Sequence, residues 1–299
     1  MAVNATDMNK LETKYRNTIK HMLSMPDCVS SPLVYLPFGI LPATAQRDLE
    51  ILGLLGQLGM CDQGDQNVRA SILHNLAFFD DKFTGWSAVV RKTAEVYGLP
   101  DPLQYLQHPW RPDRWRSHCR TAITEHWDQK LKAEAEPRSS SEYVNLSSLS
   151  TTTPMRIWQQ ARLSSNDVKQ ATTVSWMYSG AYFTHELLHK MHKVKSPSCA
   201  CNPEILENIP HILLYCEIYD DIRQECIPKF LNMNTQLVQI SDYEKLLVVS
   251  ILDPLSSKLP ETITSSWSSV SGVYALSRQF CHRIHSKREK IYLELDNKT

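Results

Sequence analysis

The clearest chemical pattern in the sequence is a group of cysteine and histidine residues in the last third of the chain. Cys199 and Cys201 are followed by His211, and four residues then separate His211 from Cys216. Three thiolates and one imidazole form the ligand set of a structural zinc site, and the second spacing is typical of such sites. Because four protein ligands leave no open position for a substrate, the pattern predicts a structural rather than a catalytic ion.

The first pair of this group departs from the usual pattern. A single residue separates Cys199 from Cys201, whereas two to four residues are usual. Cys226 or His192 are the substitute ligands if both cysteines cannot bind. The alternative interpretation is a group of reduced cysteines near the start of a helix, with no metal.

A second pattern is the H-E-x-x-H sequence formed by His185, Glu186 and His189. On a helix both imidazoles share a face and can bind zinc, while the glutamate activates a water molecule, as in a metallopeptidase. The third ligand would be Glu204 or Glu207, which lie inside the Cys/His group. The alternative interpretation is a helix with a polar, weakly basic face.

A third pattern combines arginine with tryptophan in residues 110–120. Arginine contacts phosphates and tryptophan stacks on bases, so this run predicts a nucleic-acid interface. The alternative is the start of an amphipathic helix, with Trp115 in the core and the arginines solvated or paired with acids. A smaller basic run occupies residues 282–288. The expected nucleic-acid-binding residues are Trp110, Arg111, Arg114, Arg116 and Arg120, with Lys193 and Lys195.

The composition indicates which elements position these residues. The chain has 299 residues, 42% of them hydrophobic, and its 32 Lys and Arg residues balance 32 Asp and Glu residues. This length allows one large domain or two of ordinary size, and the charge balance excludes a uniformly basic coat. Only 9 glycines occur, which argues against nucleotide-binding loops and tight hairpins. The composition therefore predicts a mainly α fold, a helical bundle with a small Cys/His zinc-binding insertion.

Apolar spacing and helix-boundary residues place the helices. One helix is expected to begin after Thr44 as its N-cap and to run to Met60. Within it Gly53, Gly56 and Gly59 form a stripe that lets another helix approach closely. The other expected helices cover residues 9–25, 66–79, 85–97, 113–135, 165–182, 218–232, 242–252 and 261–292.

Proline and serine content divides the chain. Residues 1–43 hold a helix and a proline-punctuated connector, and residues 44–138 form a helical domain. Nine of the fifteen residues in Ser139–Thr153 are Ser or Thr, which predicts a linker over 139–155. Residues 156–299 form a second helical domain that carries the Cys/His motif. No signal peptide or membrane-spanning segment is apparent, so we expect a nuclear or cytoplasmic protein with free or metal-bound thiols.

The order of these segments resembles the region downstream of the catalytic core in non-LTR retrotransposon reverse transcriptases. Residues 9–26 resemble the helix that leaves the polymerase thumb. The other matching segments are residues 31–59, 86–106, 161–182 and the Cys/His group continuing to residue 223. The C-terminal zinc motif of this family corresponds to Cys199, Cys201, His211 and Cys216, with one residue fewer between the first two.

The resemblance implies a non-catalytic, zinc-stabilised tail, because the endonuclease and the polymerase palm of the family lie upstream of this region. In the family this region is thought to hold template RNA or target DNA. The expected partners are therefore RNA, single-stranded DNA or target DNA, and no membrane. Association with a full-length reverse transcriptase or with a second copy is also expected. The alternatives are the metallopeptidase described above and a relic structural or interaction protein without a selected function.

Overall fold

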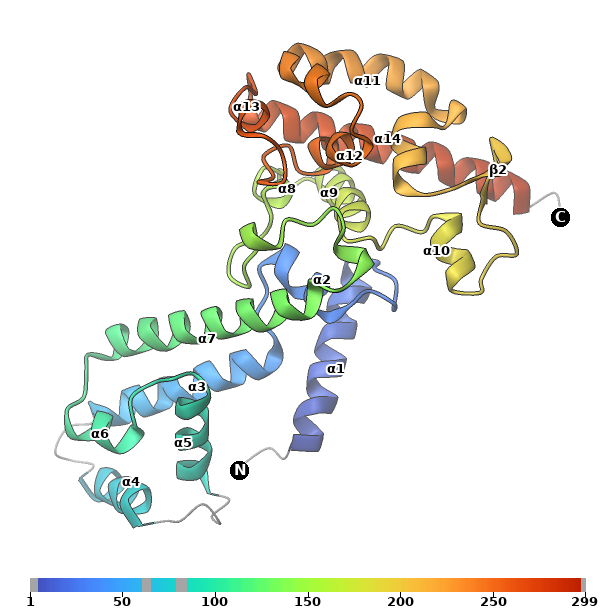
Figure 1. The fold of residues 1–299 in the computed structure, drawn as a ribbon. Helices are drawn as coiled ribbons and strands as arrows, with labels where there is room; N and C mark the ends of the chain where they lie inside the picture. The colour runs from blue at the N-terminus through green and yellow to red at the C-terminus, as the bar shows by residue number, and fades with distance from the viewer. Residues whose placement is uncertain (1–4, 61–65, 79–84, 297–299) are drawn as a thin grey trace.

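The structure is a computed structural model that describes residues 5–60, 66–78 and 85–296. Within this part of the chain it is built of helices and one two-stranded sheet, which confirms the predicted mainly α fold (Figure 1). The longer helices are α1 (Ala5–Met22), α3 (Ala43–Gly59), α4 (Gln66–Phe78), α5 (Trp86–Val96), α7 (Pro112–Ala135), α9 (Ser165–Tyr178), α11 (Asp220–Met233), α12 (Glu244–Leu252) and α14 (Val270–Asp296). The shorter helices are α2 (Ser31–Tyr35), α6 (Pro102–Gln107), α8 (Arg156–Gln159), α10 (His185–Lys190) and α13 (Glu261–Thr264). The strands are β1 (Ser198–Cys199) and β2 (Asn202–Leu206).

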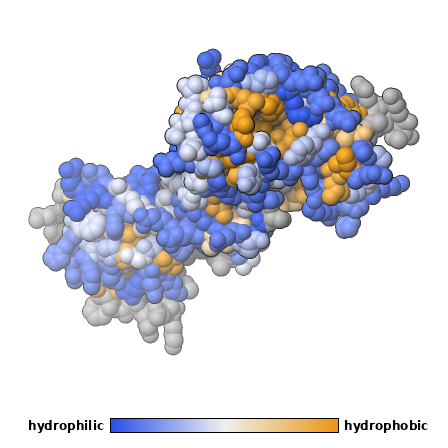
Figure 2. Space-filling model, turned by 45° about the horizontal axis from the view of Figure 1, so that its top comes forward, coloured by the Kyte–Doolittle hydropathy of each residue, from blue (hydrophilic) through white to orange (hydrophobic). Residues whose placement is uncertain are grey.

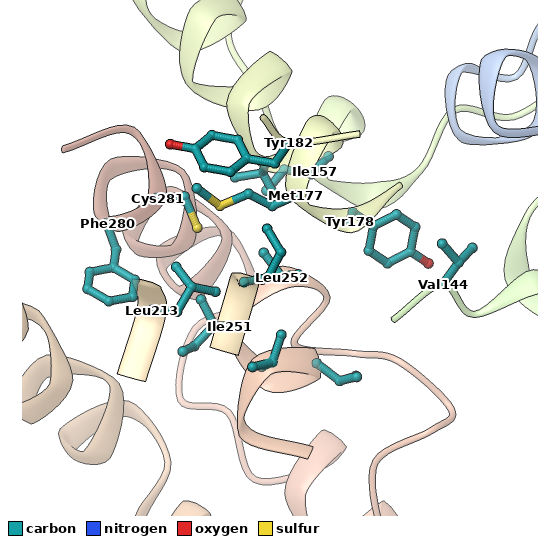
Figure 3. Packing of buried hydrophobic residues seen from close by; sticks show 14 of the residues in the cluster. Val144, Ile157, Met177, Tyr178, Tyr182, Leu213, Ile251, Leu252, Phe280 and Cys281 are labelled. Carbon is teal, nitrogen blue, oxygen red and sulfur yellow. The ribbon is translucent and has the colours of Figure 1, made fainter. Parts of the chain in front are cut away.

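The buried apolar side chains form two clusters. The smaller one is built by residues 41–123, from α3 to the first half of α7. The larger one combines residues 19–36 with residues from 131 to 284, and Figure 3 shows part of its packing around α9 and α14. Trp127 on α7 contacts both clusters. The long helix α7 therefore runs through both cores, with α4 to α6 at one end of the molecule and α11 to α14 at the other (Figure 1).

Close packing joins α3 to α7 and to α6. A Cβ atom added at Gly56 would lie 2.5 Å from Cδ1 of Trp115 on α7, and one added at Gly59 would lie 3.2 Å from Cε1 of Tyr105 on α6. A Cβ atom at Gly53 would meet nothing within 4 Å. Two of the three glycines therefore permit the close approach that the stripe predicts, and Gly53 does not take part in it.

Two details of the predicted helices were wrong. Pro42, not Thr44, occupies the N-cap position of α3. Thr44 lies inside the helix, and its side chain and backbone N–H donate hydrogen bonds to Glu12 on α1 (3.1 and 2.9 Å). The predicted helix over 261–292 is two helices, α13 and α14. Between them Trp267 turns inward and its indole N–H donates to the carbonyl of Pro254 (2.9 Å).

The Ser/Thr-rich segment 139–155 packs onto the larger core. Val144 and Leu149 are buried in that core. The backbone N–H and the hydroxyl of Thr151 both donate to the Asp128 carboxylate on α7, at 2.7 and 2.8 Å. The segment is thus fastened to both α7 and the larger core, and the domain boundaries placed around it stay a prediction.

Hydrophobic side chains are also exposed. Figure 2 shows them gathered on one face of the part that holds the larger core, whereas the visible face of the other part is mostly hydrophilic. Among the described helices, none is both long and apolar enough to cross a bilayer.

Candidate metal centre

A short hairpin and a helical turn position the four predicted metal ligands. Cys199 ends β1 and pairs with Asn202 at the start of β2, so the tight turn between the antiparallel strands consists of Ala200 and Cys201. A turn this short keeps the two cysteines at the same end of the hairpin. The spacing of one residue between Cys199 and Cys201 is therefore compatible with both cysteines joining the same group.

The second pair is held by one turn of π-helix, η5 (His211–Tyr215). The N–H of Cys216 donates to the carbonyl of His211 at 2.7 Å, which is the i to i+5 hydrogen bond of a π-helix. Four intervening residues therefore place His211 and Cys216 one above the other. The N–H of His211 in turn donates to the side-chain oxygen of Asn208 (2.9 Å), which fixes the start of the turn.

The four ligand atoms converge. All lie within 4.8 Å of one another, and within the described residues no other group of three or more such ligands comes together. Sγ of Cys199 lies 3.6 Å from Sγ of Cys216, and Sγ of Cys201 lies 3.2 Å from Nε2 of His211. With zinc–sulfur bonds of about 2.3 Å, sulfur atoms in a tetrahedral site are about 3.8 Å apart. The separation of the Cys199 and Cys216 sulfur atoms is close to this value, and the group can hold a metal ion.

Electrostatics at the group favour the neutral forms of the side chains. The hydrogen bond with the Cys216 thiol, together with burial, raises the pKa of the Cys199 thiol. Burial also raises the pKa of Cys201 and lowers the pKa of His211. A neutral imidazole keeps a lone pair for a metal, whereas the thiols must lose their protons, and a bound divalent cation favours that loss.

Arg223 on α11 contacts the backbone of the π-turn that carries His211 and Cys216. Its guanidinium is almost fully buried, donates to the carbonyl of Cys216 and to that of Ile212 (3.4 Å), and forms an ion pair with Asp220. The arginine thus satisfies carbonyl groups at the end of the π-turn and orients the Cys216 backbone. Supporting contacts of this kind hold metal ligands in place.

Glu207 connects the hairpin to α14. Its side chain is fully buried and accepts hydrogen bonds from Arg288 (Nε–Oε1 3.1 Å), from the N–H of His185 (2.9 Å) and from the hydroxyl of Tyr292. Both carboxylate oxygens of Glu207 are therefore occupied by protein donors. This connection has no local sequence signal, because its partners are far apart in the chain.

The H-E-x-x-H residues lie on α10, beside this network. Nδ1 of His185 contacts the carbonyl of Ser198 in β1 (2.9 Å), and Nδ1 of His189 contacts the carbonyl of Val194 in the loop before it (3.2 Å). Glu186 forms an ion pair with Lys190 (2.7 Å). Within the described residues, neither histidine belongs to a group that can hold a metal.

The two substitute ligands lie outside the group. Cys226 is buried on α11, where its sulfur contacts Nη1 of Arg283 at 3.7 Å. His192 is exposed and has a left-handed backbone with φ of +56°.

The predicted nucleic-acid-binding residues form two separate groups. Trp110 and the four arginines lie at the start of α7, whereas Lys193 and Lys195 follow α10 near the opposite end of the molecule (Figure 1). The four arginines are exposed, and Trp115 is buried, with its indole N–H donating to the carbonyl of Leu52 (2.8 Å). The structure therefore does not bring all of these residues onto one surface.

The charges at the start of α7 are partly free. Arg111 contacts Asp113 (3.3 Å) and Arg116 contacts Glu50 (3.5 Å), both at exposed positions. The guanidinium of Arg114 lies 5.1 Å from the ring centre of Trp110. Among the described residues, Arg114 and Arg120 have no carboxylate partner within ion-pair distance. The basic run at 282–288 differs, because its positive side chains pair with acids, as in Arg283 with Glu225 (2.7 Å) and Lys287 with Asp221 (2.7 Å).

Searches of protein-family models, of curated proteins and of solved structures found no match to this chain.

Proposed function

We propose that this chain is a non-catalytic, zinc-stabilised protein that binds nucleic acid, as expected for the retrotransposon tail that its sequence resembles. The observation that carries the proposal is the convergence of Cys199, Cys201, His211 and Cys216 within 4.8 Å. Four protein ligands complete a tetrahedral site, so the zinc would organise the fold rather than bind a substrate.

The nucleic-acid part of the proposal is supported by the first turns of α7. Four exposed arginines and a half-buried tryptophan gather there, and Arg114 and Arg120 carry charges that no described carboxylate neutralises. Unpaired guanidinium groups on a surface suit contact with a phosphate backbone. We expect RNA or single-stranded DNA to bind at this site, with Lys193 and Lys195 as a separate and more distant contact.

The zinc is tested by metal analysis of the purified chain. The wild-type protein should carry one zinc per chain, and Cys216→Ser should lose it. Cys226→Ser is the matched control, since Cys226 is also a buried cysteine but lies outside the group. Equal zinc content in the wild type and in Cys216→Ser would contradict the proposed site.

Nucleic-acid binding is tested by fluorescence anisotropy with a labelled single-stranded RNA over a range of salt concentrations. The double variant Arg114→Gln/Arg120→Gln should weaken binding about tenfold and reduce the salt slope by about 1.4, since each lost phosphate contact on a single strand contributes about 0.7. The charge-matched control is Arg162→Gln/Lys169→Gln, two exposed residues near α9. The variant Lys193→Gln/Lys195→Gln tests the second group. A folded, zinc-loaded protein that binds RNA without salt dependence would exclude this function.

A further inference from the structure

A polar pocket of about 480 Å³ lies on the larger part of the molecule, apart from both proposed sites. Its walls come from the loop before α8, from α8 itself, from the end of α9 and from the loop after α12. This volume falls in the range of small-molecule binding sites. None of the metal ligands and none of the predicted nucleic-acid-binding residues line it.

The pocket contains opposite charges that do not pair with each other. Asp253 and Arg156 both line it, yet no ion pair joins these two described residues. One carboxylate oxygen of Asp253 accepts a hydrogen bond from the hydroxyl of Tyr274 (2.9 Å), and no described donor contacts the other oxygen. Burial raises the pKa of Asp253, while Tyr274 and the charge of Arg156 act in the opposite direction. The second oxygen is thus available to a cationic or donor group of a ligand.

Asn145 adds a buried polar side chain to the wall of the pocket. The residue is only 4% exposed, and its side-chain oxygen accepts hydrogen bonds from Ser147 (2.7 Å) and Ser257 (3.1 Å). Asn145 also lines the pocket, and two serine hydroxyls hold its side-chain oxygen. The residue therefore gives the pocket a polar and ordered wall.

Tyr178 holds the backbone of Asn145 in place. Its ring extends from α9 toward Val144, and its hydroxyl oxygen accepts the backbone N–H of Asn145 at 2.8 Å (Figure 3). Tyr178 is itself fully buried, so the backbone that carries the Asn145 amide rests on the rigid core. The pocket therefore presents its polar groups from an ordered wall.

We propose that this pocket binds a free α-amino acid as a zwitterion. The carboxylate of the ligand contacts Arg156, and its ammonium group contacts the open oxygen of Asp253. A simple anion would face the Asp253 carboxylate, and a simple cation would face the Arg156 guanidinium. Only a ligand with both charges pairs with both walls, and charge-assisted hydrogen bonds make each contact strong.

The experiment is a calorimetric titration of the full chain with each of the common L-amino acids at millimolar concentration. The tightest binder is then compared with the amine that lacks its carboxylate and with the acid that lacks its ammonium group. Each analogue should bind at least about tenfold more weakly, because each has lost one charged contact. An analogue that binds as tightly as the parent amino acid, or the absence of any binding amino acid, would overturn the proposal.

Two variants locate the binding in this pocket. Arg156→Met and Asp253→Asn should each weaken the amino acid about tenfold or more, and the asparagine keeps an acceptor for Tyr274. The matched control is Arg162→Met, an exposed arginine in the next segment that does not line the pocket. Circular dichroism establishes that each variant is folded, and Arg156→Met alone decides the question if Asp253→Asn does not fold. Equal affinity in Arg156→Met and Arg162→Met would place the ligand elsewhere and refute the assignment.

Discussion

Arg288 donates hydrogen bonds to the carboxylate of Glu207 across 81 positions of sequence, with Nε 3.1 Å from Oε1. The Glu207 side chain is fully buried, and that of Arg288 is 9% exposed. Glu207 directly follows the strand β2, and Arg288 lies in α14. The pair therefore fastens the cysteine-bearing hairpin to the C-terminal helix, and the metal group depends on a contact far from it in sequence.

Removing one partner of this pair should destabilise the fold strongly. Arg288→Met leaves the Glu207 carboxylate buried without its guanidinium, and we expect a loss of about 3 kcal/mol in the free energy of unfolding. Urea denaturation followed by circular dichroism measures this loss. The control is Lys287→Met, because Lys287 forms an exposed ion pair with Asp221 that should contribute less than about 1 kcal/mol. Similar losses in the two variants would contradict the structural role of the pair.

Chelation of the metal should destabilise one region before the other. If zinc binds the Cys/His group, a strong chelator should lower the melting temperature, and added zinc should restore it. Hydrogen exchange should then accelerate in residues 198–216. The smaller core, residues 41–123, should keep its protection because none of the ligands lies in it. Uniform loss of protection over both regions would show that the site stabilises the whole chain.

The glycines of α3 should respond in opposite ways to the same substitution. Gly56→Ala places a methyl group against the Trp115 ring and should destabilise the protein by about 1–3 kcal/mol. Gly53→Ala meets no neighbour and should stabilise the helix by about 0.5–1 kcal/mol. Thermal melting of the two variants provides the test. The same sign for both changes would mean that α3 does not pack on α7 as described.

Acid should weaken the packing of α14 on α9, where the His285 ring lies edge-on to the Trp176 ring with 5.5 Å between the ring centres. Burial lowers the pKa of His285, the charge of Arg288 acts in the same direction, and Glu289 opposes them. A histidine in the unfolded chain has a pKa of about 6.5 and therefore binds a proton more readily than His285 does in the folded protein. The associated stability is present above about pH 6.5 and is lost as the pH falls below that value.

Denaturation of His285→Gln at a series of pH values isolates this contribution. The variant should show a flatter decline in stability below about pH 6.5 than the wild type, because glutamine takes up no proton. His108→Gln, at a solvent-exposed histidine, should follow the wild-type curve. An unchanged decline in His285→Gln would assign the acid sensitivity to other groups.

Local sequence patterns predicted most of the helices. Helices α3, α7 and α9 have apolar residues at helical spacing, and the residues that determine where each helix begins and ends lie within a few positions of those ends. The patterns were wrong where a distant partner decides the outcome. The Thr44 hydroxyl donates to Glu12 and so does not cap α3. The indole N–H of Trp267 donates to the carbonyl of Pro254, at the point where the chain breaks between α13 and α14.

The metal group could be predicted because its ligands are close in sequence and chemically distinctive. The contacts that support this group could not be predicted, because Arg288 and Tyr292 reach Glu207 only after the chain has folded. The pocket lined by Arg156 and Asp253 could not be predicted from the sequence for the same reason, since about a hundred residues separate these two charged residues. Neither residue belongs to a motif.

The helix α7 also sets how far the ends of the molecule can influence each other. Its 24 residues span about 36 Å without a break, and it belongs to both cores. If a bound ligand displaces the arginine-bearing end, no hinge within this helix can take up the displacement. A displacement of that end would instead be transmitted to the contacts of Trp127 and Leu131 in the larger core and to the hydrogen bonds between Asp128 and Thr151.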